Sequence, residues 1–150
     1  MTPDTGPSTE DRIRLNADLG ELDRLMAWLD EFCERHEIPD EAHYHLNIAV
    51  EELVINAIKH GRCSPAEGAI NVGLRLSGQE LNITITDTGI PFNPLNAPPP
   101  DLTSRLVDRP IGGLGIHLVR SLMNSVEYER EGGENRLRLR KDLTATPHAG

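Results

Sequence analysis

Apolar and polar residues alternate in three parts of the chain, a period of two that is typical of strands buried on one face. The first part covers residues 13–19, where every second residue is apolar. The second covers residues 70–85 with a break at Gly78, and the third covers residues 126–139 with a break at Gly132-Gly133. The short breaks predict two hairpins, and the first part predicts a separate strand.

Other segments repeat their apolar residues at helical spacing and predict three helices, over residues 20–36, 40–60 and 116–123. The second segment follows Pro39, which favours a helix start at that point. The sequence also offers end signals, namely Asp18 with Glu21 as a capping box for the first helix, Asp40 as N-cap of the second, and Gly61 as its end near His60.

The predicted order is strand, two helices, hairpin, long loop, helix and hairpin. Antiparallel strands with helices on one face make an α+β fold, a two-layer α/β sandwich with a mostly antiparallel sheet. A doubly wound parallel sheet fits badly, because short turns join two of the strand pairs. The loop over residues 92–110 contains three consecutive prolines and predicts a lid or a flexible segment.

Composition limits the domain and the partners. The 150 residues suit one domain over 12–142, with a disordered N-terminus over 1–11 and a flexible tail over 143–150. The net charge of −9 argues against nucleic acid and against anionic membranes as partners. We find no apolar segment long enough to cross a bilayer and no signal-peptide core. Cys33 and Cys63 have neither metal nor redox spacing, which favours free thiols in a reducing, cytoplasmic compartment.

A polar strip is the most informative feature of the second predicted helix. At about 100° per residue, Glu52, Asn56 and Lys59 fall within roughly 60° of one another, with His45 beside them. Apolar residues border this strip on both sides, Ala49, Val50, Leu53 and Ala57 on one and Ile48 and Ile55 on the other. A carboxylate and an amide in such a setting are either satisfied internally or line a pocket.

Asp87 is an acid on the apolar face of a predicted strand, since it continues the phase of residues 81–85. One interpretation is a turn aspartate, because Asp87-Thr-Gly89 is good turn chemistry. The other is a carboxylate that accepts a hydrogen bond from a ligand, such as an exocyclic amine. Gly89 would then let the ligand approach the backbone closely.

Three glycines, Gly112, Gly113 and Gly115, precede the third predicted helix. They suit a flexible hinge, or a phosphate cradle in which free backbone amides and the helix dipole attract an anion. The run lacks the lysine of a P-loop and follows no strand directly, so a dinucleotide-binding loop is also disfavoured. The histidines have no zinc-like spacing.

Taken in order, these segments resemble the ATP-binding domain of the GHKL ATPases, the group that includes gyrase and the histidine kinases. Glu52-x-x-x-Asn56-Ala-x-x-His60-Gly resembles the N box. Asp87-Thr-Gly89-Ile-Pro91-Phe92-Asn-Pro94 resembles the first glycine box, and Gly112-Gly113-Leu-Gly115 resembles the second. Within this group, the Pro-Phe-x-Pro form and the small size resemble the anti-sigma-factor serine/threonine kinases, over about residues 13–141.

The resemblance implies ATP and Mg²⁺ as cofactors and assigns roles to residues of this sequence. Glu52 would be the general base, Asn56 would hold Mg²⁺, and Asp87 would bind the adenine amino group. The full set of implied nucleotide-binding residues is Asn56, Lys59, His60, Asp87, Gly89, Pro91, Phe92, Arg105, Arg109, Gly112, Gly113, Leu114 and Gly115. The chain departs from the family at Asn93, where many members carry an acid, and in a lid with few basic residues.

The resemblance implies a protein kinase that acts as an anti-sigma factor, phosphorylates an anti-sigma-factor antagonist and sequesters a sigma factor. A regulatory module that binds ATP and a partner without phosphoryl transfer is the alternative. A histidine-kinase catalytic domain is disfavoured, because the chain has no room for a phosphoacceptor helix pair. A homodimer is compatible with the resemblance.

Overall fold

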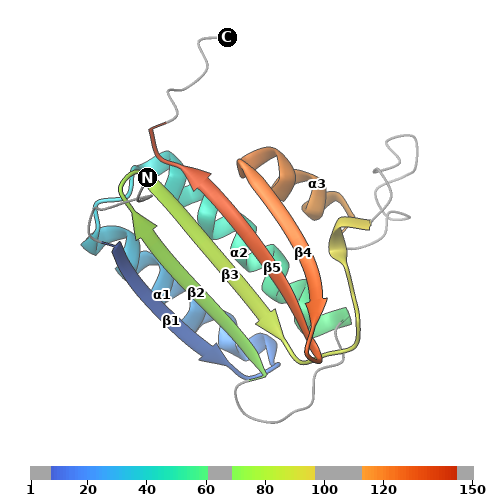
Figure 1. Ribbon diagram of the computed structural model, residues 1–150. Helices are drawn as coiled ribbons and strands as arrows, with labels where there is room; N and C mark the ends of the chain where they lie inside the picture. Colours follow the sequence, from blue (N-terminus) through green and yellow to red (C-terminus); the bar gives the residue numbers. More distant parts are fainter. Residues whose placement is uncertain (1–7, 61–68, 97–112, 145–150) are drawn as a thin grey trace.

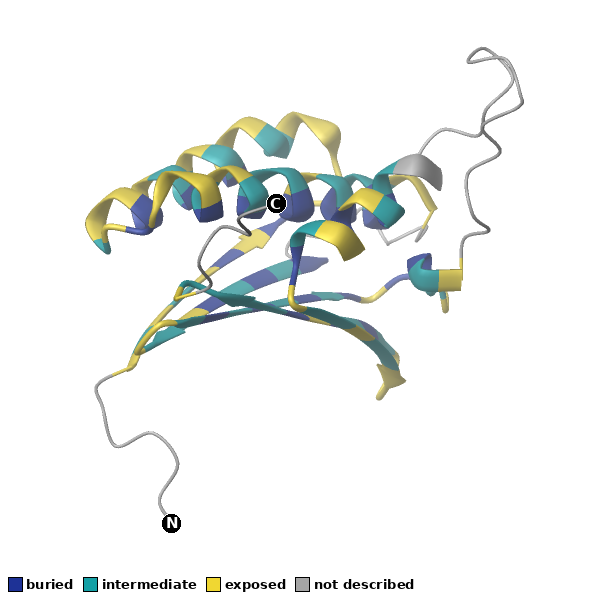
Figure 2. Ribbon diagram, turned by 90° about the horizontal axis from the view of Figure 1, so that it is seen from above, coloured by how far each residue is buried: buried dark blue, intermediate teal, exposed yellow. Residues whose placement is uncertain are grey.

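The computed structural model describes residues 8–60, 69–96 and 113–144, which form one antiparallel sheet covered by helices on one face (Figures 1 and 2). The strands are β1 (Ser8–Leu15), β2 (Ile70–Ser77), β3 (Glu80–Asp87), β4 (Ser125–Glu131) and β5 (Glu134–Asp142), in the order β1-β2-β3-β5-β4. The helices are α1 (Leu22–Arg35), α2 (Asp40–His60) and α3 (Gly113–Leu122), with 3-10 turns η1 (Leu19–Glu21) and η2 (Pro94–Asn96). The predicted two-layer α+β sandwich is confirmed.

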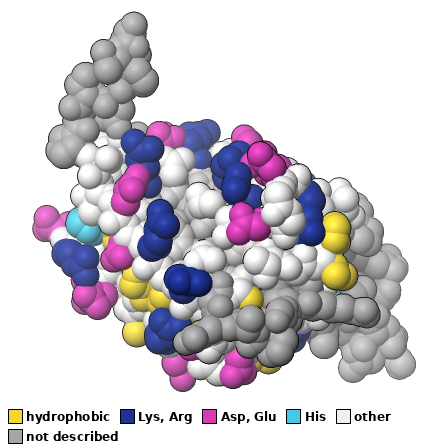
Figure 3. Space-filling view, turned by 60° about the horizontal axis from the view of Figure 1, so that its bottom comes forward, with side chains coloured by type: hydrophobic (Ala, Val, Ile, Leu, Met, Phe, Trp, Pro, Cys, Tyr) yellow, Lys and Arg dark blue, Asp and Glu magenta, His cyan; other side chains and the backbone are white. Residues whose placement is uncertain are grey.

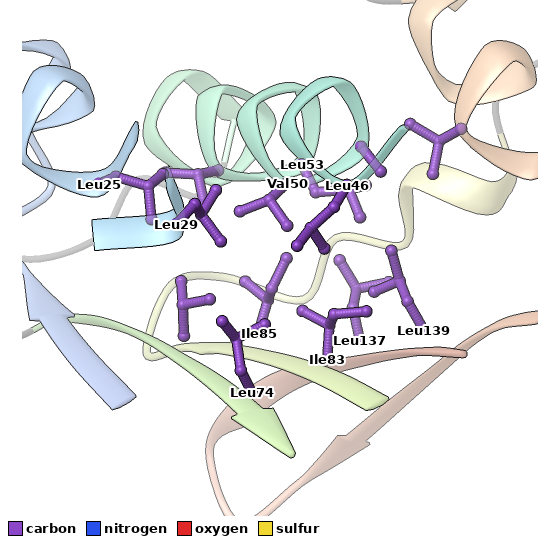
Figure 4. Close-up of a cluster of buried hydrophobic side chains, with 14 of the residues drawn as sticks. Leu25, Leu29, Leu46, Val50, Leu53, Leu74, Ile83, Ile85, Leu137 and Leu139 are labelled. Atoms are coloured by element: carbon purple, nitrogen blue, oxygen red, sulfur yellow. The ribbon is translucent and has the colours of Figure 1, made fainter. Parts of the chain in front are cut away.

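The core lies between the helices and the sheet and is built almost entirely from aliphatic side chains. Figure 4 shows side chains of α1 and α2 that point toward side chains of the sheet, with Leu29 and Leu53 on the helices and Leu74, Ile83 and Leu139 on the strands. Because the strand residues alternate, only one face of the sheet is apolar, and the helices must cover that face.

Strand β1 is the main correction to the predicted elements. It begins at Ser8 and ends at Leu15, and it pairs with β2 from Ser8↔Ser77 to Leu15↔Ile70. It therefore starts four residues before the domain boundary predicted at residue 12, and residues 8–11 belong to the sheet. Backbone pairing with β2 does not require apolar side chains, so the polar residues 8–11 extend this edge strand beyond the apolar alternation.

The entry to α1 also differs from the predicted capping box. Asp18 caps the 3-10 turn η1, because its Oδ1 accepts a hydrogen bond from the Gly20 amide at 3.1 Å, whereas α1 has Glu21 as its N-cap and no side-chain cap hydrogen bond. The Glu21 carboxylate instead accepts from the Asn16 amide at 2.8 Å. The short turn η1 shifts the first turn by a few residues, and α1 proper begins at Leu22.

The two predicted hairpins are confirmed. Gly78 turns β2 into β3 with φ of 60°, and Gly132 and Gly133 turn β4 into β5 with φ of 60° and 79°. Residues other than glycine adopt such angles only with strain, which explains the glycines at these turns.

The face of the sheet that the helices leave bare is polar. It is hollowed around Gly73, between Asn71, Arg75 and Thr84. Figure 3 shows basic and acidic side chains interspersed over the surface in view. Across residues 8–60, 69–96 and 113–144, we find no helix with the length and hydropathy that crossing a bilayer requires.

Candidate functional site

Helix α2 carries Glu52 and Asn56 on the side that faces α3. Asn56 is only 5% exposed, and its amide hydrogen-bonds the Glu52 carboxylate. The second carboxylate oxygen of Glu52, Oε2, is buried and has no hydrogen-bond partner among the described residues. Burial raises the pKa of Glu52, and the hydrogen bond from Asn56 and the positive charge of Lys59 oppose this rise only in part.

Gly115 lies directly against this carboxylate. A Cβ atom at Gly115 would stand 2.3 Å from Cδ of Glu52 and 2.5 Å from its Oε1, distances that real atoms do not occupy. The third residue of α3 must therefore be glycine if Glu52 is to keep this position. The contact joins the predicted N box to the second glycine box, since Gly113, Leu114 and Gly115 form the first turn of α3.

Asp87 ends strand β3 on the helix side of the sheet and is 7% exposed. Its Oδ1 accepts a hydrogen bond from the Gly89 amide at 2.9 Å and another from the Asn135 side-chain amide at 2.9 Å. The first bond confirms the turn interpretation of Asp87-Thr-Gly89. The turn and a ligand-binding role are compatible, because a carboxylate accepts several hydrogen bonds.

Asn135 is a buried residue of this site that the sequence reasoning missed. It is 3% exposed and lies opposite Asp87 in the β3–β5 pairing. Its Nδ2 also donates to the Ile90 carbonyl at 2.8 Å. Its Oδ1 accepts hydrogen bonds from the Phe92 amide and from the Tyr128 hydroxyl.

Asn135 thus uses both donors and both acceptor positions of its amide, and it fixes the first glycine box to strands β4 and β5. The signal that could have identified it is its phase. Asn135 continues the inward alternation of Leu137 and Leu139, where a polar residue is as unusual as Asp87 is on β3.

The first glycine box also contacts the end of α2. The rings of His60 and Phe92 lie with centroids 5.2 Å apart, although His60 itself is exposed. Arg130 of β4 donates a hydrogen bond to the Gly89 carbonyl at 2.7 Å. Asn93, the departure from the family pattern, accepts from the Leu95 amide at 2.9 Å and so caps η2.

The structure brings many of the predicted site residues together. Glu52 meets Gly115, His60 meets Phe92, and Asp87 meets Gly89. Lys59 and Pro91 lie on exposed positions near these contacts. Arg105, Arg109 and Gly112 lie outside the described residues.

The chemistry of this arrangement suits a nucleotide that carries a hard cation. No group of three or more His, Cys, Asp or Glu side chains able to hold a metal occurs in the described part of the chain. Mg²⁺ needs no such group, because it takes one or two protein oxygens and completes its shell with phosphates and water. The Asn56 side-chain oxygen is a donor of that kind, while the unpartnered Oε2 of Glu52 is left to accept a proton. Glu52 itself lies against Gly115 in the N-terminal turn of α3, and such a turn favours anions.

Known proteins match this chain over most of its length. Residues 15–141 match the model of the histidine kinase-like ATPase domain family. The serine/threonine-protein kinase BtrW of Bordetella bronchiseptica is 27% identical over 88% of this chain and 93% of its own length. The serine-protein kinase RsbW of Listeria monocytogenes is 32% identical, over 61% of this chain and only 62% of its own length.

A solved structure has the same fold. The crystal structure of the RsbU and RsbW domains of a Mycobacterium tuberculosis protein matches 92% of this chain and 33% of that chain, with a TM-score of 0.69 and 18% identity. At this identity the match concerns the arrangement of helices and strands.

Proposed function

The chain belongs to the histidine kinase-like ATPase domain family and has the GHKL-type fold, and from its site we propose that it is an ATP- and Mg²⁺-dependent serine/threonine protein kinase. One observation carries the catalytic part of the proposal. Glu52 is a half-buried carboxylate with a raised pKa and a free oxygen, at the point where α2 meets the first turn of α3. A base in this position would receive the proton of an acceptor hydroxyl as that hydroxyl attacks the terminal phosphate.

The other residues of the site would bind and orient the nucleotide. The buried Asp87 would accept a hydrogen bond from the adenine amino group, and Asn135 would hold that carboxylate in place. Asn56 would bind Mg²⁺ through its side-chain oxygen, and Mg²⁺ would neutralise charge on the phosphates. Gly113 and Gly115 would present backbone amides of α3 to the phosphates, together with the neighbouring Leu114 and Gly112.

In the proposed transfer, the acceptor oxygen forms a bond to the γ-phosphorus and the bond from that phosphorus to the bridging oxygen breaks. ADP leaves, and the hydroxyl proton passes to Glu52. Catalysis would come mainly from positioning and charge neutralisation, because the protein forms no covalent bond to the phosphoryl group. An arginine of the loop, Arg105 or Arg109, would steady the γ-phosphate.

The names of the relatives support phosphorylation of serine or threonine, and the resemblance of the motifs to the anti-sigma-factor kinases supports a role in partner switching. We propose that the protein is an anti-sigma factor, that its protein substrate is an anti-sigma-factor antagonist and that its second partner is a sigma factor. These partners act on transcription, so the proposed location is the cytoplasm. A homodimer is part of the proposal, and light scattering on the purified protein would test it.

The central test is phosphoryl transfer from labelled ATP to purified candidate antagonists. We expect label on a serine or threonine of one antagonist with the wild-type protein, and loss of label with Glu52→Gln. Nucleotide binding by Glu52→Gln, measured by calorimetry, should persist, because the amide keeps the shape of the carboxylate. Transfer by Glu52→Gln at the wild-type rate would show that another group is the base. If ATP binds but no antagonist is labelled, the alternative of a regulatory module without transfer holds.

A further inference from the structure

One apolar feature of α2 is not explained by the fold or by the nucleotide. The polar strip of α2 has apolar residues on both sides, and the side that includes Leu53 faces the core. The other side, with Ile48 and Ile55, is only half-buried. Tyr44 extends this second side by one helical turn and is 65% exposed.

Helix α3 adds an exposed leucine at the same place. Gly115, near the start of α3, lies against Glu52 in the second half of α2. Leu122, at the end of α3, lies near the first half of α2, because Lys141 donates a hydrogen bond to the Leu122 carbonyl and also contacts His45. The two helices are therefore antiparallel, and Leu118 lies level with Ile48, each one turn from the Glu52–Gly115 contact. Leu118 is 45% exposed, because Ile116 and Val119 of the same helix take the core positions.

We propose that Tyr44, Ile48, Ile55 and Leu118, here called the α2–α3 patch, are the docking surface for the protein that carries the acceptor hydroxyl. The inference rests on the proposed function. A hydroxyl that transfers its proton to Glu52 must reach a carboxylate that is sunk between α2 and α3. The protein bearing that hydroxyl therefore has to contact the outer surface beside Glu52, and that surface is the α2–α3 patch.

The chemistry of the patch describes its occupant. Large apolar side chains with high exposure are rare in the described part of the chain, and only Leu19, Tyr44, Ile90 and Leu118 are of this kind. Two of these four, Tyr44 and Leu118, belong to the helices that meet at Glu52, Leu118 about one turn and Tyr44 about two turns from the Glu52–Gly115 contact. Glu41 and Glu51, both exposed, lie beside Tyr44 on α2. The patch therefore fits a folded protein that presents apolar side chains next to its serine or threonine, with basic residues at the rim.

The test compares the variants Tyr44→Ser and Leu118→Ser with Leu19→Ser as the matched control. Leu19 is 46% exposed, almost the same as Leu118, but it precedes α1 beside the opposite edge strand. The substrates are the acceptor protein labelled in the transfer assay above and a short peptide that contains only its phosphorylated segment.

We expect each patch variant to raise the KM for the intact acceptor by about tenfold or more, because a few central residues carry most of the binding energy of an interface and the patch places Tyr44 and Leu118 among them. The KM for the peptide, the Kd for ATP and the melting midpoint should stay at wild-type values, and Leu19→Ser should change none of them. An unchanged KM for the intact acceptor would overturn the proposal.

Two other outcomes would also overturn it by identifying a different occupant. A matching loss of ATP affinity in the patch variants would indicate that the nucleotide-binding segments of the chain itself cover the patch. A change in molecular mass in solution would indicate that a second copy of the chain covers it. If the wild-type protein labels no acceptor at all, the proposed function fails, and that result is distinct from a failure of the docking surface.

Discussion

Replacing Gly115 by alanine tests the contact between the second glycine box and the N box, where Gly115 lies directly against Glu52. The new Cβ would lie 2.3 Å from Cδ of Glu52, whereas carbon atoms pack at about 3.5–4.0 Å. The carboxylate would have to retreat by about 1.2–1.7 Å. Glu52 is a flexible side chain, so we expect it to swing away while the fold is kept. A misplacement of about 1 Å at a reacting group can lower the rate about 100-fold.

The stability of the same variant depends on whether Glu52 is present. Alanine is favoured over glycine inside a helix by up to about 1 kcal/mol. With Glu52→Ala, the space is free, and Gly115→Ala should raise the melting midpoint by about 2–4 °C for a domain of this size. With Glu52 in place, displacement of the carboxylate offsets this gain, because forced repacking costs about 1–3 kcal/mol.

Thermal melting of the wild type, the two single variants and the double variant forms a cycle that isolates this interaction. We expect a coupling free energy of about 1 kcal/mol or more. Ser121→Ala, at an exposed position of α3 away from Glu52, is the control for a change to alanine in this helix, and it also removes the hydrogen bond from the Ser121 hydroxyl to the Leu118 carbonyl. Equal gains from Gly115→Ala with and without Glu52 would refute the contact, and an unchanged transfer rate for Gly115→Ala would refute the placement of Glu52 as base.

Three further predictions concern single residues. Glu52→Gln should raise the melting midpoint at neutral pH by about 2–4 °C, since burial disfavours the charge of the half-buried carboxylate and the isosteric amide carries none. An unchanged or lower midpoint in calorimetry would contradict a cost of burying this charge. Asn135→Ala should lower the free energy of unfolding by about 1–3 kcal/mol and weaken ATP binding, because it removes one hydrogen-bond donor from the Asp87 carboxylate and one from the Ile90 carbonyl. Asn82→Ala on the bare face of the sheet is its control in urea unfolding and calorimetry, and equal effects from both would argue against a positioning role. Gly133→Ala, at φ of 79°, should lower stability by about 1 kcal/mol in urea unfolding and leave the Kd for ATP unchanged, and any effect on ATP binding would point to a hairpin that touches the site.

The elements with a strong local period were predictable from the sequence. The β2–β3 hairpin follows from alternation on both sides of Gly78, and the position of Asp87 on its apolar face follows from the same count. The start of β1 was not predictable in this way, because residues 8–11 join the sheet through backbone pairing with β2. The pairing between strands depends on the tertiary structure, and the local alternation of apolar and polar residues does not determine it.

The candidate site was predictable where a residue breaks the pattern of its own element, as Glu52 and Asn56 do on α2. Asn135 breaks the pattern of β5 in the same manner, but its role depends on register. Only the β3–β5 pairing places it opposite Asp87. Its two remaining partners, the Ile90 carbonyl and the Phe92 amide, belong to an irregular segment whose conformation no period predicts.

The effect of Glu52 on stability distinguishes a structural role from a functional one, because the two roles predict effects of opposite sign. A carboxylate retained for the fold would have partners and a lowered pKa, and its neutralisation would destabilise the protein. Glu52 has a raised pKa because burial disfavours its charge, so the folded state binds its proton more tightly than the unfolded state does. Its contribution to stability is therefore full below the ordinary pKa of 4.5 and is lost as the pH rises through the folded-state value. The advantage of Glu52→Gln should be absent in acid and grow toward neutral pH, while transfer by the wild type rises over the same range as the base ionises. A residue that lowers stability at the pH where it is needed for transfer is explained by the reaction, and the fold alone gives no reason to keep it.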